Sequence, residues 1–355
     1  MRINYARLIN YRNYADEEFF FSSDLEFILG DNAQGKTNLL EAIYLACTGK
    51  AFRARSSKEA FFNRKLPFRL ELEFSQGEDK SKFIYTHKDN KPLIHVNNIQ
   101  IERRSELFGR FPMVLFSPEH LRMLREGPSH RRNFFDREIS LVSPSYFYSL
   151  VQYQRLLRSR NILLKENYDP LQMDVYEEKL ALYGKKLYET RGLFVEALNE
   201  KSSRVHDFIS GGKEVLNLSY KSSFAGVEDP RGRYREDRKK DLALGYTSFG
   251  PQGDDMYIEI DKKDARRFAS QGQARIASLS IFFGLLPFIS EQLDKKPLVL
   301  LDDVFSELDR FRRHQLLELL QDHQVILTTT DLDGLDVSHL KHFNKTTILE
   351  GKKYV

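Results

Sequence analysis

The chain has 355 residues, of which 41% are hydrophobic and 30% are charged, and this length allows a sizeable core in one large or two smaller domains. Its single cysteine, Cys47, excludes an intrachain disulfide, and its longest apolar run, 281–289, is too short to span a bilayer. With no signal-peptide pattern at the N-terminus, we expect a cytoplasmic protein without a membrane partner. The net charge of +4 permits a nucleic-acid partner without requiring one.

The first part of the chain predicts strands at 3–8, 18–21 and 25–29. The last of these leads directly into Gly30–Thr37, which fits G-x-x-x-x-G-K-[ST], and then into a helix over 38–46. Strand, glycine loop and helix in this order predict a phosphate-binding loop, because backbone N–H groups and the helix N-terminus point at the anion.

This loop predicts ATP and Mg²⁺ as ligands. Lys36 would reach the β- and γ-phosphates, and the Thr37 hydroxyl would ligate the metal. The expected nucleotide-binding residues of this loop are Gly30, Asp31, Asn32, Ala33, Gln34, Gly35, Lys36, Thr37 and Asn38.

The next stretch alternates apolar and polar residues at 70–74, which predicts a half-exposed strand, and further strands are expected at 82–87 and 93–96. The N-terminal part should therefore be largely antiparallel sheet beside the nucleotide-binding core. Another apolar strand is expected at 111–116, followed by Ser117-Pro118-Glu119, where the composition changes.

Basic residues crowd into 122–137, and Arg131 and Arg132 are candidate DNA-binding residues within this segment. The alternative is structural, since such arginines often pair with local carboxylates, here Glu126, Asp136 and Glu138. The sequence leaves both readings open.

Long helical patterns follow. Leucines recur at heptad spacing in 150–164, and a second apolar pattern covers 187–205 until Gly211-Gly212 ends it. Neither pattern persists far, so we expect a short antiparallel helical hairpin, not an extended coiled coil. The charged stretch 227–241 predicts an exposed, mobile loop.

Ser270-Gln271-Gly272-Gln273 opens an apolar helix to about residue 288, after a strand at 256–260. Ser270 and Gln273 fit a capping box, and the same helix N-terminus could receive a γ-phosphate.

The strand 297–301 runs into Asp302 and Asp303, a Walker B pattern. Asp302 would hold Mg²⁺ and Asp303 would polarise the attacking water, so Lys36 and Asp303 are the catalytic candidates. A helix at 310–320 and strands at 325–330 and 348–354 complete the chain.

The chain resembles the ATP-binding-cassette ATPases in the order of three motifs: the phosphate loop, then Ser270–Gln273, then the Walker B strand. Ser306–Asp309 stands where that class has its D-loop. More narrowly, the whole chain resembles the bacterial RecF family of DNA-repair ATPases. The segments that carry this resemblance are Leu8–Tyr14, Val114–Glu119, Gly127–Asp136, Ser270–Gln273 and Leu301–Asp309.

The resemblance implies an α/β ATPase head with a mixed sheet, a phosphate-loop core and an antiparallel subdomain, in which 1–118 and 291–355 form one lobe. An inserted, mainly helical lobe would cover 119–290, its end being the less certain boundary. The resemblance also implies an ATP-dependent homodimer with slow hydrolysis that binds gapped, single- and double-stranded DNA. It would help RecR, with RecO, to place RecA on single strands. Ser270, Gln271, Gly272 and Gln273 would then contact ATP on the other subunit.

Three positions depart from the family pattern. Related ATPases often have glycine where this chain has Ala33, and most transporter-type cassettes have glutamate where it has Asp303. Gln252-Gly253 stand where the family motif often carries His-Arg.

Arg12 and Arg53 are further candidate nucleotide contacts by their position relative to the phosphate loop, with a structural salt bridge as the alternative for each.

Three other functions compete with that of a DNA-repair ATPase. The missing coiled coil disfavours the head of another SMC-like chromosome or nuclease-associated ATPase, and the opening and basic segments disfavour a transporter ATPase. A phosphotransferase would leave Ser270–Gln273 and the D-loop without a purpose.

Overall fold

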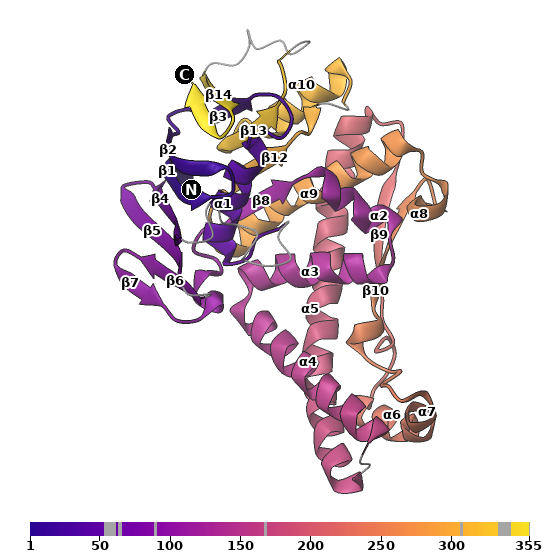
Figure 1. Cartoon of the computed structure of the whole chain (residues 1–355). Helices are drawn as coiled ribbons and strands as arrows, with labels where there is room; N and C mark the ends of the chain where they lie inside the picture. Colours follow the sequence, from indigo (N-terminus) through magenta and orange to yellow (C-terminus); the bar gives the residue numbers. More distant parts are fainter. Residues whose placement is uncertain are drawn as a thin grey trace. The chain divides into compact units, whose positions relative to one another are not determined.

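The computed structural model describes residues 1–52, 62, 66–88, 91–166, 169–305, 308–332 and 342–354. Arg53 and the first two D-loop positions, Ser306 and Glu307, lie outside the described residues. The chain divides into two compact units (Figure 1). Unit 1 comprises Met1–His120, Phe208–Gly212 and Leu285–Val355, and unit 2 comprises Leu121–Asp207 and Lys213–Gly284.

Unit 1 contains two six-stranded sheets among the described residues. The antiparallel sheet has the order β2-β1-β4-β5-β6-β7, and the mixed sheet has the order β15-β14-β3-β13-β12-β8. Their strands are β1 Arg2–Tyr11, β2 Tyr14–Phe20, β3 Leu25–Leu29, β4 Phe68–Gln76, β5 Asp79–Lys88, β6 Lys91–Val96, β7 Ile99–Ile101, β8 Met113–Phe116, β12 Leu298–Asp302, β13 Val325–Thr329, β14 Phe343–Leu349 and β15 Lys352–Tyr354. The predicted antiparallel N-terminal sheet is confirmed, while 348–354 is a hairpin of two strands instead of one.

Helix α1, Lys36–Thr48, packs against strands of both sheets: β8, β12 and β13 on the mixed side, and β1, β4 and β5 on the antiparallel side. Eleven of its 13 residues are buried. A helix with apolar residues all round is stable only when it is enclosed, and the two sheets enclose it here. The second helix of this unit is α10, Arg310–Leu319.

The mixed sheet positions the nucleotide site. Strand β3 lies between β13 and β14 and runs parallel to both, and β12 lies parallel to β13 on its far side. The phosphate loop follows β3, and Asp302 ends β12, so both lie at the carboxyl edge of this sheet, where α/β proteins bind ligands.

Unit 2 is mainly helical. Its elements are α2 Arg122–Arg125, α3 Pro128–Val142, α4 Pro144–Lys165, α5 Pro170–Ser210, β9 Leu216–Lys221, α6 Pro230–Glu236, α7 Arg238–Leu244, β10 Asp255–Ile260, β11 Lys263–Asp264, α8 Ala265–Phe268 and α9 Gln271–Leu293, the last residues of α5 and α9 belonging to unit 1. Strands β11, β10 and β9 form an antiparallel sheet in that order.

Helices α4 and α5 run antiparallel, as the ring contact of Tyr148 with Tyr183 and the ion pair of Arg160 with Glu177 show. The predicted hairpin is therefore confirmed, but α5 extends over 41 residues, well beyond the 187–205 pattern. A fully buried network of Arg160, Glu177 and Asp241 joins α4, α5 and α7, and its charges interrupt the apolar periodicity.

The prediction of a mobile loop at 227–241 was wrong, because this stretch forms α6 and most of α7. Asp229 caps α6 by accepting from the Gly232 N–H, and Pro230 occupies the first turn, where its missing N–H costs nothing. Tyr234 and Asp241 are fully buried, and the Asp241 carboxylate accepts from Arg160 Nη1 at 2.7 Å. Most charged side chains of this stretch are exposed, and Asp241 alone among them is buried, in its ion pair with Arg160.

Among the described residues, α9 alone is long and apolar enough to cross a membrane, and 72% of its most apolar window is buried inside the protein. Burial of this extent is typical of a core helix.

Candidate nucleotide site

The phosphate loop and the Walker B strand meet through a side-chain hydrogen bond. Thr37 Oγ1 donates to Asp302 Oδ1 at 2.7 Å across a sequence separation of 265 residues. Thr328 Oγ1, on the intervening strand β13, donates to the same oxygen at 2.9 Å. The pairing that the sequence predicted for Thr37 and Asp302 is thus present in the structure, and Thr328 is a third member that no motif indicated.

Lys36 lies over its own loop. Its ammonium donates to the carbonyls of Gly30 at 2.5 Å and Asp31 at 2.9 Å. Burial lowers the pKa of Lys36, and the neighbouring carboxylates of Asp303, Asp302 and Asp31 raise it. The ammonium therefore stands among three acids at the sheet edge, and a divalent cation would balance the remaining negative charge of this group.

Asp303 follows Asp302 in a left-handed backbone conformation, with φ of 49°. Its N–H donates to the carbonyl and to Oγ1 of Thr328, both at 3.1 Å. A non-glycine residue with positive φ is a mark of backbone strain that functional sites often hold. Here Thr328 fixes the strained residue by two bonds.

The oxygen atoms at this edge suit Mg²⁺, which prefers carboxylate and hydroxyl ligands and keeps several waters. Asp302 is 2% exposed, and the hydroxyls of Thr37 and Thr328 both converge on its Oδ1. These groups fit the predicted metal, and Thr37 and Asp302 would be its protein ligands.

Asn13, in the turn between β1 and β2, contacts the phosphate loop from outside the motif. Its Nδ2 donates to the Gln34 carbonyl at 2.7 Å, and its Oδ1 accepts from Asn38 Nδ2 at 2.8 Å. The neighbouring Tyr14 hydroxyl donates to the Gly35 carbonyl at 2.9 Å. These contacts hold the loop from outside the motif, and the sequence did not predict them.

The turn between β14 and β15 supports the loop from the other side. The Glu350 N–H donates to Gln34 Oε1 at 2.5 Å, and the Gly351 N–H donates to the Gln34 carbonyl at 3.0 Å. A Cβ on Gly30 would meet the Ile348 carbonyl oxygen at 2.4 Å, so only glycine fits against this strand. Gln34 therefore serves to position the loop.

Ala33 has φ of 66°, a left-handed conformation that glycine adopts without strain. The loop tolerates alanine at this position, at a cost of roughly 1 kcal/mol in backbone strain.

Arg12 forms a salt bridge with the buried Glu41 on α1, with Nη2 2.7 Å from Oε2. The sequence left two roles open for Arg12, a nucleotide contact or a structural salt bridge, and this contact favours the salt bridge.

In unit 2, Ser270 and Gln273 form the predicted capping box at the start of α9. The Gln273 N–H donates to Ser270 Oγ at 3.2 Å, and the Ser270 N–H donates to Gln273 Oε1 at 2.9 Å. Ser270, Gln271 and Gly272 are exposed. The cap holds the first turn of α9 in shape while leaving the small residues open to a partner.

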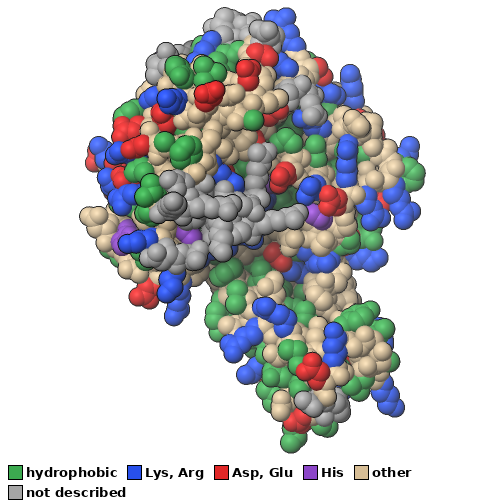
Figure 2. All heavy atoms as spheres, in the orientation of Figure 1, with side chains coloured by type: hydrophobic (Ala, Val, Ile, Leu, Met, Phe, Trp, Pro, Cys, Tyr) green, Lys and Arg blue, Asp and Glu red, His purple; other side chains and the backbone are tan. Residues whose placement is uncertain are grey.

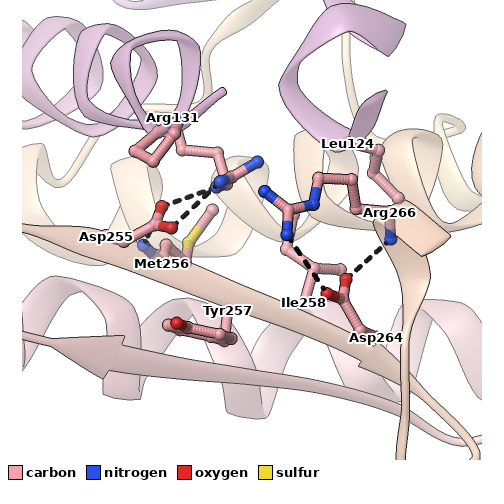
Figure 3. Close-up of a pocket in the computed structure, with 9 residues that line it drawn as sticks. Leu124, Arg131, Asp255, Met256, Tyr257, Ile258, Asp264 and Arg266 are labelled. Carbon is pink, nitrogen blue, oxygen red and sulfur yellow. Dashed lines mark hydrogen bonds and ion pairs between the residues drawn. The ribbon is translucent and has the colours of Figure 1, made fainter. Parts of the chain in front are cut away.

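Arg131 is a buried structural residue. Its guanidinium lies 2.6 Å from Asp255 Oδ1, donates to Asp255 Oδ2 at 2.9 Å, and also donates to the carbonyls of Met123 and Glu126. Figure 3 shows this pair lining a pocket of about 160 Å³, with Arg266 and Asp264 opposite. At 4% exposure, Arg131 favours the structural alternative over DNA contact.

Arg132 is half-buried and donates from Nη1 to the Asp254 carbonyl at 2.8 Å. Burial lowers its pKa, as does the nearby Arg191. Figure 2 shows lysine and arginine side chains spread over the drawn face among hydrophobic ones, without one dominant basic patch. Arg132 remains a predicted DNA contact.

Replacing Arg131 by alanine should lower the free energy of unfolding by about 3 kcal/mol, because the Asp255 carboxylate would lose its partner at a poorly solvated position. Arg122→Ala is the matched control, since that side chain is 61% exposed in an i,i+4 pair with Glu126 and should change stability by less than about 1 kcal/mol. Urea denaturation measures both. Equal stability of the two variants would argue against the structural role of Arg131.

Gln252 and Gly253 occupy the turn before β10. Gln252 Nε2 donates to the carbonyls of Thr247 at 3.1 Å and Phe249 at 2.9 Å, and its Oε1 accepts from the Tyr153 hydroxyl. This amide therefore serves as local structure in unit 2.

Comparison with known proteins places these features in a common context. A family model described as the RecF/RecN/SMC N terminal domain matches residues 2–340. The chain is 38% identical over 361 residues to the DNA replication and repair protein RecF of Clostridium acetobutylicum, with 99% of each chain covered. It is 37% identical over 346 residues to the protein of the same name from Clostridium tetani, with 94% of each covered.

Among solved structures, it is similar to the recombination mediator protein RecF with ATP in the RecFOR pathway. The TM-score is 0.89 at 32% identity, and the match covers 99% of this chain and 96% of the other. The Smc head bound to the C-winged helix domain of ScpA has a TM-score of 0.58 at 15% identity, which is a likeness of fold alone.

Proposed function

This chain belongs to the RecF family of DNA replication and repair proteins, and we propose that it works as an ATP-dependent clamp on damaged DNA. Two chains would close around two ATP molecules, hold gapped DNA while ATP is intact, and separate after slow hydrolysis. The resemblance to this family and the ABC-type ATPase head, both predicted from the sequence, are confirmed by matches over nearly the whole chain.

The observation that carries the proposal is the bond from Thr37 Oγ1 to Asp302 Oδ1 at 2.7 Å. It brings the hydroxyl that follows the phosphate-loop lysine onto the first Walker B acid, as coordination of one Mg²⁺ by both residues requires. Thr37 and Asp302 would hold the Mg²⁺, which would supply positive charge against the negative charge that develops during phosphoryl transfer.

The residues of this site divide the remaining work. Lys36 would hold the β- and γ-phosphates, and the N–H groups of Gly30–Asn38 would cradle them. Asp303 would orient and polarise the attacking water. Because aspartate is one methylene shorter than glutamate and Thr328 fixes its backbone, we expect slow hydrolysis, which suits a switch.

The second half of each site would come from the other chain. Ser270–Gln273 presents an exposed helix N-terminus, whose partial positive charge favours a γ-phosphate. The capping box already satisfies one N–H in that turn through Ser270 Oγ, and Gln271 and Gly272 leave space for close approach.

We propose a cytoplasmic role in which the ATP dimer recognises gaps between single- and double-stranded DNA. From family membership, RecR and RecO would be its partners, and RecA would be loaded on the adjacent single strand. Arg132 is the remaining candidate for a phosphate contact, since Arg131 is engaged with Asp255.

The test is the molecular mass in solution with Mg²⁺ and ATP, compared with ADP, followed by binding to gapped and fully paired DNA. We expect a doubled mass only with ATP and tighter binding of the gapped duplex. Asp303→Asn should keep the ATP dimer and slow single-turnover hydrolysis about a hundred-fold, because Asp302 still holds the metal.

The matched control is Glu200→Gln, which changes an exposed carboxylate on α5 that forms an i,i+4 ion pair with Arg204. It should behave as wild type in both assays. A monomer at all nucleotide conditions, or wild-type hydrolysis by Asp303→Asn, would contradict the clamp and the role of Asp303 respectively.

A further inference from the structure

A carboxylate outside every recognised motif holds the last residue of Ser270–Gln273. We propose that Glu214 is a positioning residue for this motif, and that buried His206 packs behind it. The inference rests on the proposed function, in which the motif completes the nucleotide site of a partner chain. All three residues lie in unit 2.

The side-chain amide of Gln273 is used at both ends. Its Oε1 accepts from the Ser270 N–H at 2.9 Å, which closes the capping box. Its Nε2 donates to Glu214 Oε1 at 3.0 Å. A carboxylate accepts but cannot donate, so Glu214 dictates which end of the amide faces Ser270. Without it, the amide is free to rotate out of the cap.

Glu214 lies beside a buried histidine, His206, near the end of α5. Glu214 Oε2 lies 3.6 Å from His206 Nε2, and His206 is fully buried while the Glu214 side chain is 21% exposed. The second carboxylate oxygen therefore faces inward and the first faces the motif. One side chain thus links the exposed turn of α9 to the interior.

The other ring nitrogen of His206 returns to α9. Nδ1 lies 3.1 Å from Ser280 Oγ, and the Ser280 hydroxyl donates to the Ile276 carbonyl at 2.8 Å. Since that hydroxyl hydrogen is engaged, Ser280 Oγ accepts, and His206 carries its proton on Nδ1. Nε2 then turns its lone pair toward Glu214, which accounts for a separation longer than a normal hydrogen bond.

Burial and the nearby carboxylates act in opposite directions on the pKa of the His206 imidazole. Burial lowers the pKa of His206, whereas Glu214, Asp261 and Asp207 raise it. The neutral ring offers Glu214 no donor and only packs beside its carboxylate, whereas a protonated ring would form an ion pair with it.

Gln273 and Ser280 lie seven positions apart on α9, so they share one face of that helix. The contacts Gln273–Glu214–His206–Ser280 therefore fix two turns of α9 against the end of α5 and the residues that follow it. The first turn of a helix frays most readily, and a γ-phosphate needs that turn in one defined position.

The experiment compares Glu214→Ala, Glu214→Gln and the exposed-residue control Glu200→Ala in three measurements: ATP binding by the monomer, ATP-dependent dimerisation, and kcat against KM. Glu214→Ala should weaken the ATP dimer about ten-fold, because a charge-assisted hydrogen bond to the motif is lost. Binding of ATP by the monomer and the melting temperature should stay at wild-type values, as they should throughout for Glu200→Ala.

Glu214→Gln should restore dimerisation. Its amide oxygen accepts from Gln273 Nε2, and its amide nitrogen donates to the lone pair on His206 Nε2. A merely structural role for Glu214 would lower the melting temperature of both variants and would give no such split between alanine and glutamine.

Ser270→Arg, run in parallel, separates the two levels of inference. If Ser270→Arg fails to dimerise while Glu214→Ala dimerises as wild type, the positioning role is wrong and the proposed function stands. If Ser270→Arg dimerises normally, the composite site is wrong, and the role of Glu214 falls with it. Loss of the dimer in both Glu214 variants, with intact folding, would also overturn the role assigned here.

Discussion

An equal mixture of Lys36→Met and Ser270→Arg chains should hydrolyse ATP, although neither chain does so alone. Lys36→Met removes the ammonium that holds the β- and γ-phosphates and should lower hydrolysis about a hundred-fold or more. Ser270→Arg places a long side chain where the partner's γ-phosphate must lie. In a two-fold dimer each site takes Lys36 from one chain and Ser270 from the other, so a heterodimer has one site with both lesions and one with neither.

Random pairing should give a mixture with about a quarter of the wild-type rate. The control mixes Lys36→Met with Asp303→Asn, whose lesions both belong to the loop-bearing half of the site, so no heterodimer regains an intact site. The composite site is refuted if the first mixture is as inactive as its components, or if the second regains as much activity. Ser270→Arg monomers should bind ATP normally.

Gly351→Ala should weaken ATP binding at least about ten-fold, although Gly351 belongs to no nucleotide-binding motif. Its φ is 73°, and a Cβ there would come within 2.2 Å of the Asn13 carbonyl oxygen. Since Asn13 Nδ2 bonds the Gln34 carbonyl, the turn cannot give way without moving the phosphate loop. Isothermal titration with ATP measures the change directly.

Gly77→Ala is a close match for the control. Gly77 also has a positive φ, 61°, in a hairpin turn, but a Cβ there meets nothing within 4 Å. Both variants pay about 1 kcal/mol of backbone strain, and only Gly351→Ala adds the contact with Asn13. Equal ATP affinities in the two variants would show that the β14–β15 turn does not support the loop.

The local signals in the sequence predicted the nucleotide-binding core well. Strand β3 has the predicted bounds, and the helix after the loop differs by two residues at each end. Both features depend on contiguous residues: an apolar run, a glycine pattern, and helical spacing. The capping box at Ser270 succeeded for the same reason, since its two members are three positions apart.

Features that depend on distant residues were not predicted. Asn13, Thr328 and Gly351 contact the loop or Asp302 from strands and turns whose pairing no local pattern specifies. Arg131 looks like any surface arginine until Asp255, 124 positions away, is brought beside it. The same holds for Asp241, whose charge suggested solvent until Arg160 covered it.

The order in which the chain is made gives the mixed sheet a further significance. Strand β3 pairs on one side with 325–329 and on the other with 343–347. An N-terminal strand can therefore take its place in this sheet only after the C-terminal strands have been synthesised. During translation the phosphate loop leaves the ribosome with neither neighbour present and without the 350–351 turn. The loop therefore gains the strands and the turn that support it only after the C-terminal residues have been made.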